Sequence, residues 1–257
     1  MRTVTGITDE RLAHALTGYA GMADRVISNP QRWLGMDEDP PPQARLPIRA
    51  LDALQNRAFG KTTPASPLWP QLPLDSRVQW WVTRIGISAD LAAATPQLAG
   101  ALADRVPMQA ALDASAAGLV VCATAREHGR PAPPDWVLLL GKVLFDRDLP
   151  STDLTVPSSV ESDHRLATVP PDAARPPVGR HALSDGARRA ATTLWQLART
   201  LADLHHLLEQ RPRRNFLARG IAKLPVVGIA GGWLDERGGI GRSAGETARL
   251  IEPSRAT

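Results

Sequence analysis

The chain has 257 residues, of which 43% are hydrophobic, a size and composition that suffice for one sizeable core. Its single cysteine excludes an intramolecular disulfide and a cysteine-rich zinc site. The formal net charge is +4, but nine Lys and Arg against four Asp and Glu fall within residues 211–257, so this end carries +5 and the remainder about −1. A basic end favours an anionic partner such as phospholipid headgroups or nucleic acid.

Proline-separated segments with apolar residues at helical spacing make up most of the chain, and alternating strand patterns are scarce. The first predicted helix begins after Thr8, a suitable N-cap, and continues to Ile27. A proline-rich loop follows at 37–45, and a short helix is predicted from Ile48 to a stop near Gly60.

A pair of tryptophans marks the next helix, which Asp75 is expected to cap. Trp80 and Trp81 are adjacent in the sequence and so cannot share one helix face, and we expect one indole to be exposed or half-buried. Thr95 and Pro96 have the N-cap and N1-proline pattern of a further helix start.

Small and apolar residues dominate the middle of the chain. A helix is predicted over 107–128, with small residues for close packing and with Cys122 as a core residue. The segment 135–145 is so apolar that we expect it at the centre of the core. Residues 150–183 contain six prolines and few large apolar groups, which predicts a linker or disordered insertion before a long helix over 184–210. The apolar stripe of that long helix is Ala187, Ala191, Leu194, Ala198, Leu201, His205 and Leu208.

The segment from 213 to 234 combines positive charge with an apolar, glycine-rich run. The run is uncharged from Leu224 to Leu234 and is shorter than the roughly 20 residues that a membrane-spanning helix needs. We therefore predict that it packs tightly within the protein or contacts lipid at shallow depth. The cations predicted to meet an anionic surface are Arg213, Arg214, Arg219 and Lys223. The residues predicted for close packing or membrane contact are Leu224, Pro225, Val226, Val227, Gly228, Gly231, Gly232 and Trp233.

Two short motifs near the C-terminus have structural and chemical interpretations. Gly228 with Gly232, and Gly241 with Gly245, have the G-x-x-x-G spacing that lets another backbone approach a helix closely, and we expect tight packing at both pairs. Ser243 lies in a G-x-S-x-G pattern, which serine hydrolases use as a nucleophile elbow. No strand pattern precedes it and no histidine follows it, so the pattern lacks its usual context.

The sequence predicts no metal or cofactor site. His205, His206 and Glu209 are close together but lack the H-E-x-x-H pattern of a zinc site, and we interpret them as ordinary helical residues. The glycines at 239–245 resemble a dinucleotide fingerprint, but the chain ends before the βαβ unit that such a site needs.

In four places the chain resembles the EcsC family. These are Trp33 followed by Leu46-Pro47-Ile48; the small-residue segment from Ala92 to Asp104 followed by Val106-Pro107-Met108; Ala125-Arg126-Glu127-His128-Gly129 followed by Trp136-Val137-Leu138-Leu139-Leu140; and Lys223-Leu224-Pro225-Val226-Val227-Gly228 with Gly231-Gly232. Where the family has a Gly-rich stretch before an Asp-x-Pro step, this chain is Ala-rich and continues with Asp104-Arg105-Val106-Pro107. The resemblance implies a helical, cytoplasmic or membrane-associated protein of a family named for a gene beside an ABC transporter. It implies no catalytic residues.

The sequence thus predicts an all-α, single-domain protein over 1–257, a helical bundle of about seven to nine helices with a proline-rich insertion at about 150–183. We expect a non-enzymatic accessory protein, cytoplasmic or membrane-associated, without a cofactor. Its expected partner is an anionic membrane surface or a protein such as a transporter, and no specific nucleic acid is expected. The alternatives are a serine hydrolase that uses Ser243 and a weak nucleic-acid binder that uses the basic C-terminal region.

Overall fold

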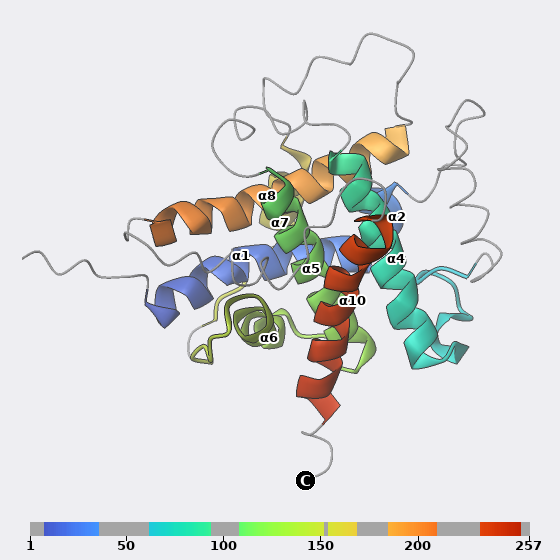
Figure 1. Ribbon diagram of the computed structural model, residues 1–257, viewed down its shortest axis with the longest axis horizontal. Helices are drawn as coiled ribbons and strands as arrows, with labels where there is room; N and C mark the ends of the chain where they lie inside the picture. The colour runs from blue at the N-terminus through green and yellow to red at the C-terminus, as the bar shows by residue number, and fades with distance from the viewer. Residues whose placement is uncertain are drawn as a thin grey trace, which may run out of the picture.

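The computed structural model describes residues 8–35, 62–93, 108–151, 154–168, 185–209 and 232–252. Within these residues the chain forms eight α-helices, one 3₁₀ helix and no strand, which confirms the all-α prediction (Figure 1). Among the helices so described, none is both long enough and apolar enough to cross a membrane. The helix starts predicted near Ile48 and at Thr95 lie outside the described residues.

The first helix, α1 (Asp9–Ser28), begins where the sequence predicts. The Thr8 side chain accepts a hydrogen bond of 3.3 Å from the amide three residues later and so satisfies a free donor of the first turn. On the inner face, the fully buried Tyr19 donates its hydroxyl to the Ser115 carbonyl at 2.5 Å. Gly118 allows this contact, because a Cβ there would lie 2.8 Å from the Tyr19 hydroxyl.

The central helix of the bundle is α5 (Met108–Glu127). Its packing partners are α4 (Leu74–Ala93), α6 (Pro133–Phe145), α8 (Asp185–Glu209) and α10 (Gly232–Ile251) (Figure 1). Every residue from 119 to 123 is 0% exposed, so other elements cover this part of α5 on all sides. The predictions of small residues for close packing and of Cys122 as a core residue are confirmed, and burial raises the pKa of the Cys122 thiol.

Helix α6 lies at the edge of the bundle, although the sequence predicts it at the centre. It buries one face, formed by Trp136, Val137, Leu140 and Gly141, whereas Leu138 on the other side is half-buried. The chain after α6 folds back over it. This return brings the Leu149 side chain so close to Gly141 that a Cβ there would lie 2.3 Å from it. The apolar residues of α6 are therefore shared between the bundle and this returning segment.

Helices α4 and α8 complete the core. The described part of the predicted α8 stripe is buried at Ala191, Leu194, Ala198 and Leu201, which confirms that part of the pattern. The Trp195 indole of α8 donates to the Ala92 carbonyl near the end of α4 at 3.2 Å. Helix α4 begins at Leu74, so Asp75 stands in its first turn rather than before it, where a carboxylate favours the helix dipole.

The range 150–183, predicted as a linker, contains a further helix, α7 (Ser159–Ala167). The Ser158 side chain accepts a hydrogen bond of 3.2 Å from the Glu161 amide, so S-x-x-E, a sequence signal of a helix start, is present here. The structure differs from the prediction in this part because Leu166 and Ser162, each 1% exposed, dock α7 on the bundle. Residues 169–183 lie outside the described part of the chain.

Candidate functional site

The residues predicted to bind an anionic surface lie outside the described residues. This holds for Arg213, Arg214, Arg219 and Lys223 and for the apolar residues from 224 to 231. Gly232 and Trp233 stand in the first turn of α10, but the Trp233 side chain is not among those described. The roles assigned to these residues therefore stay predictions.

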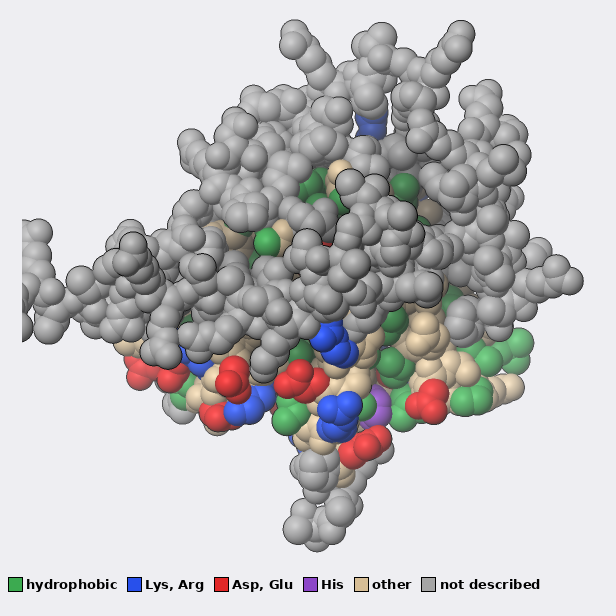
Figure 2. All heavy atoms as spheres, viewed as in Figure 1, with side chains coloured by type: hydrophobic (Ala, Val, Ile, Leu, Met, Phe, Trp, Pro, Cys, Tyr) green, Lys and Arg blue, Asp and Glu red, His purple; other side chains and the backbone are tan. Residues whose placement is uncertain are grey.

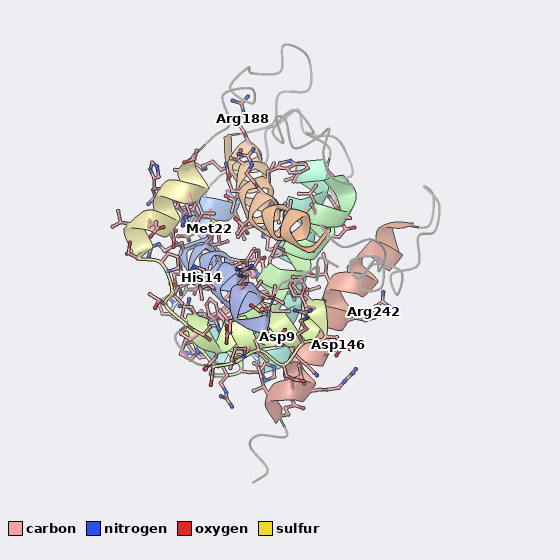
Figure 3. All side chains as sticks on the ribbon, turned by 90° about the vertical axis from the view of Figure 1, so that its left-hand side faces the viewer. Asp9, His14, Met22, Asp146, Arg188 and Arg242 are labelled. Atoms are coloured by element: carbon pink, nitrogen blue, oxygen red, sulfur yellow. The ribbon has the colours of Figure 1, made fainter. Side chains whose placement is uncertain are left out.

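The helix that follows this segment, α10, lies along one edge of the bundle (Figure 3) and packs on α5, α4 and α6. Its buried row is Ala244, Thr247 and Ile251. The opposite row is exposed and consists of Arg242, Glu246, Arg249 and Leu250. Figure 3 shows Arg242 pointing away from the other helices. Helix α10 is therefore held by one face and presents basic, acidic and apolar side chains on the other.

The described glycine pair of α10 is not in a tight contact, contrary to the prediction. Among the described residues, and apart from the backbone of α10 itself and the adjacent residues, a Cβ at Gly241 would meet no heavy atom within 4 Å, and one at Gly245 would meet only the Arg249 side chain, at 3.9 Å. The buried row runs through Ala244 and Thr247, so the glycines lie at its margin and not under another backbone. Gly228 of the other pair lies outside the described residues.

Ser243 lies within α10 and not on a turn between a strand and a helix. Its hydroxyl is half-buried and donates to the Gly239 carbonyl one turn earlier, at 3.3 Å. A nucleophile elbow instead projects its serine from a sharp strand-to-helix turn. The geometry therefore does not favour the hydrolase alternative.

The described side chains show no group of three or more His, Cys, Asp or Glu that could hold a metal ion. The side chains of His205, His206 and Glu209 in α8 lie outside the described set.

The most extensive polar cluster, which sequence reasoning missed, surrounds Glu127 at the end of α5. Its carboxylate, 7% exposed, accepts hydrogen bonds from the Trp69 indole at 3.2 Å and the Trp81 indole at 2.9 Å. Arg77 of α4 pairs with the other carboxylate oxygen at 2.6 Å. Three donors thus compensate one buried charge, an arrangement that ties α5 to α4 and to the 3₁₀ helix Trp69–Gln71.

The same 3₁₀ helix explains why the expectation of an exposed or half-buried indole is wrong. Trp80 and Trp81 are 6% and 0% exposed. Trp80 packs edge-on against Trp81, with ring centroids 4.9 Å apart, and against Trp69, with centroids 5.3 Å apart. Trp69 therefore covers the indole that would otherwise face solvent.

A second cluster joins α7 to the first two helices. Asp163 of α7 accepts hydrogen bonds from Arg25 Nε at 2.6 Å and Arg25 Nη2 at 3.2 Å. Arg32 in α2 (Pro30–Leu34) lies 3.7 Å from the same carboxylate. The hydrogen bonds from Arg25 lower the pKa of Asp163, and the charges of Arg25 and Arg32 act in the same direction against desolvation.

We expect this cluster to stabilise the protein near neutral pH and to lose its effect in acid. The pKa of Asp163 is lower in the folded protein than its ordinary value of 3.8, so the stabilisation is complete above that value and disappears as pH falls through the folded pKa. The charged groups that act on Asp163 are Arg25 and Arg32, and Asp24 of α1 acts in turn on Arg25.

The measurement is urea unfolding of the wild type and of Asp163→Asn between pH 7 and about pH 3. The wild type should be more stable at pH 7, and the difference should narrow below about pH 4. A difference in the free energy of unfolding that is as large at about pH 3 as at pH 7 would contradict the ionic role of Asp163.

On the face shown in Figure 2, acidic and basic side chains are interspersed over the lower part of the described surface. The described surface also carries ion pairs such as Arg147 with Asp9, at 2.9 Å, and Lys142 with Asp148, at 3.1 Å. The excess positive charge of the chain belongs instead to residues 211–257.

Comparisons of the chain with protein-family models, with curated proteins and with solved structures found no match. The class that the described residues define is an all-α helical bundle with an amphipathic C-terminal helix at its edge.

Proposed function

We propose that the chain is a non-enzymatic accessory protein that binds an anionic membrane surface, or a protein complex such as a transporter, through its C-terminal region. The observation that supports this proposal is the position of α10, which packs at the edge of the bundle and exposes Arg242 and Arg249. The basic and apolar residues 213–231 directly precede α10 in the chain. They are therefore joined to a helix that has one face open to a partner.

The distribution of charge supports an electrostatic contribution. Residues outside 211–257 carry about as many acidic as basic groups. Net attraction to an anionic surface would therefore come from the C-terminal region. Each Lys or Arg near such a surface contributes about 1 kcal/mol, and salt screens this contribution. The neighbouring apolar run would add binding that salt does not screen.

Membership of the EcsC family is part of the same proposal. The residues that carry the resemblance are those quoted above, and an all-helical bundle agrees with the fold that the family implies. A transporter partner rests on this resemblance alone. A cytoplasmic or membrane-associated location is likewise a proposal.

A nucleic-acid partner is the second candidate, because phosphates would meet the same cations. The proposal favours lipid because an apolar run lies beside the cations, from Leu224 to Leu234. Hydrolysis through Ser243 has no comparable support, since its hydroxyl bonds within its own helix.

The test is co-flotation of the purified protein with neutral and with anionic vesicles at low and high salt. Neutralising Arg213, Arg214, Arg219 and Lys223 to glutamine should weaken binding to anionic vesicles at least about tenfold at low salt, given about 1 kcal/mol for each charge. The loss should shrink at high salt, because screening already weakens the wild-type contact.

A control with the same change in net charge replaces Arg45, Arg49, Arg57 and Lys61 by glutamine, and it should bind nearly as the wild type does. If both variants lose vesicle binding equally, the loss depends on net charge and not on the position of these four residues. If the wild type floats with neither kind of vesicle at either salt concentration, the membrane proposal is refuted. Binding to a DNA duplex but not to vesicles would favour the nucleic-acid candidate.

A further inference from the structure

Helix α7 buries few side chains against the rest of the bundle. It has nine residues, of which Ser162 and Leu166 are buried, and its Val160 side chain is 77% exposed. An isolated helix of this length does not persist in water. Its order therefore depends on contacts with the rest of the protein.

The surface under α7 is a groove on α1 at two glycines. A Cβ at Gly21 would lie 3.0 Å from the Ser162 hydroxyl and 3.2 Å from Val156, which precedes α7. A Cβ at Gly18 would lie 3.1 Å from the Arg165 guanidinium. The groove exists because α1 has no side chains at these positions, and α7 with its leading segment fills it.

Charge supplies the directional part of the attachment. Asp163 bonds Arg25 of α1 through two nitrogens and also faces Arg32 of α2. The other ion pair of α7, Arg165 with Glu161 at 2.6 Å, lies within the helix and does not tie it to α1. On the remaining side, Gln196 of α8 donates to the backbone carbonyl of Thr168.

We propose that α7 is a releasable strap, held over the groove at Gly18 and Gly21 by the bonds of Asp163 to Arg25 and Arg32, and that it opens as a unit while the bundle stays folded. Anions that compete for the two arginines release it. Regions with few buried apolar contacts open at lower free energy than the core, and here the buried side chains of α7 number two. Release of the strap would uncover the face of α1 that carries Gly18 and Gly21. This device does not depend on the proposed membrane contact.

Amide hydrogen exchange on the full chain tests this proposal. Amides of α7 should exchange at least about tenfold faster than those of residues 119–123 in α5, which open only with the bundle. Asp163→Asn should speed exchange in α7 by about a further tenfold and leave α5 unchanged, because it removes charge-assisted bonds to α1. Salt at about 1 M should speed α7 exchange in the wild type and have little effect in Asp163→Asn.

Glu161→Gln is the matched control, because it removes an ion pair of similar length that lies within the same helix. It should change α7 exchange by less than about twofold. Arg32→Gln, which removes only the longer contact, should give an effect between those of the two carboxylate variants. Equal protection of α7 and α5 in the wild type, or equal effects of Asp163→Asn and Glu161→Gln, would overturn the proposal.

Discussion

Glu127→Ala should lower the free energy of unfolding by about 3–5 kcal/mol, the range found when one partner of a buried ion pair is removed. The change leaves the Arg77 guanidinium, which is 21% exposed, without its carboxylate. It also leaves the indole N–H groups of Trp69 and Trp81 without an acceptor. Arg77 Nε is already buried without a partner, so no spare acceptor compensates the loss.

The measurement is urea unfolding followed by tryptophan fluorescence, with near-UV circular dichroism to report the packing of the indoles. The free energy of unfolding of Glu127→Gln should lie between those of the wild type and Glu127→Ala. The amide keeps an oxygen that accepts from the indoles, but it presents no charge to Arg77. Asp148→Ala is the control, since its carboxylate is 88% exposed, and it should cost less than about 0.5 kcal/mol. A cost below about 1 kcal/mol for Glu127→Ala would show that the cluster contributes little.

This cluster also shows what the sequence does not reveal. The donors stand 58, 50 and 46 positions before Glu127, so no local pattern joins them. Read locally, Glu127 is a polar residue at the end of a helix, beside His128 and Gly129. Its environment depends on how α4 and the 3₁₀ helix fold onto α5, which is tertiary information.

Local signals, by contrast, predict the helices themselves. Thr8 caps α1 as expected, and the 4-3 spacing of α8 gives its buried stripe in the described part. Helix α5 is predicted as tightly packed because small uncharged residues fill its middle, and it is indeed surrounded. These patterns act over one or two turns and need no knowledge of distant partners.

The errors arise where partners decide the outcome. Helix α7 carries a start signal at Ser158 and Glu161, but its apolar pattern is weak, and its packing on α1 depends on the distant glycines Gly18 and Gly21. The spacing of Gly241 and Gly245 places both on one helix face but does not say whether that face meets another helix. For the candidate site, charge and hydropathy locate a segment, and the described residues supply only the helix that follows it.

The second large effect is expected from Gly35→Ala, at about 3 kcal/mol or more. Gly35 ends α2 with a φ of 61°, which alone costs a residue with a Cβ about 1 kcal/mol. A Cβ there would also lie 2.0 Å from the Gly186 carbonyl oxygen of α8, and a backbone atom cannot swing away as a side chain can. Helix α2 would have to shift away from α8, which disturbs the hydrogen bond of 2.8 Å from the Thr193 hydroxyl to the Trp33 carbonyl.

Two other glycines allow the stability change of Gly35→Ala to be compared with those of alanine variants at positions without close contacts. A Cβ at Gly86 in α4 or at Gly241 in α10 would meet no heavy atom of the described residues within 4 Å, apart from its own helix backbone and the adjacent residues. Alanine at either helical position should leave stability unchanged or raise it by up to about 1 kcal/mol, because glycine loses more backbone freedom on folding. Thermal and urea unfolding of the three variants measure the contrast. Similar stabilities for Gly35→Ala and Gly86→Ala would contradict the close approach of α2 to α8 at Gly35. A loss of stability in Gly241→Ala would instead reveal that the face of α10 carrying this glycine is covered by another part of the chain or by a second molecule.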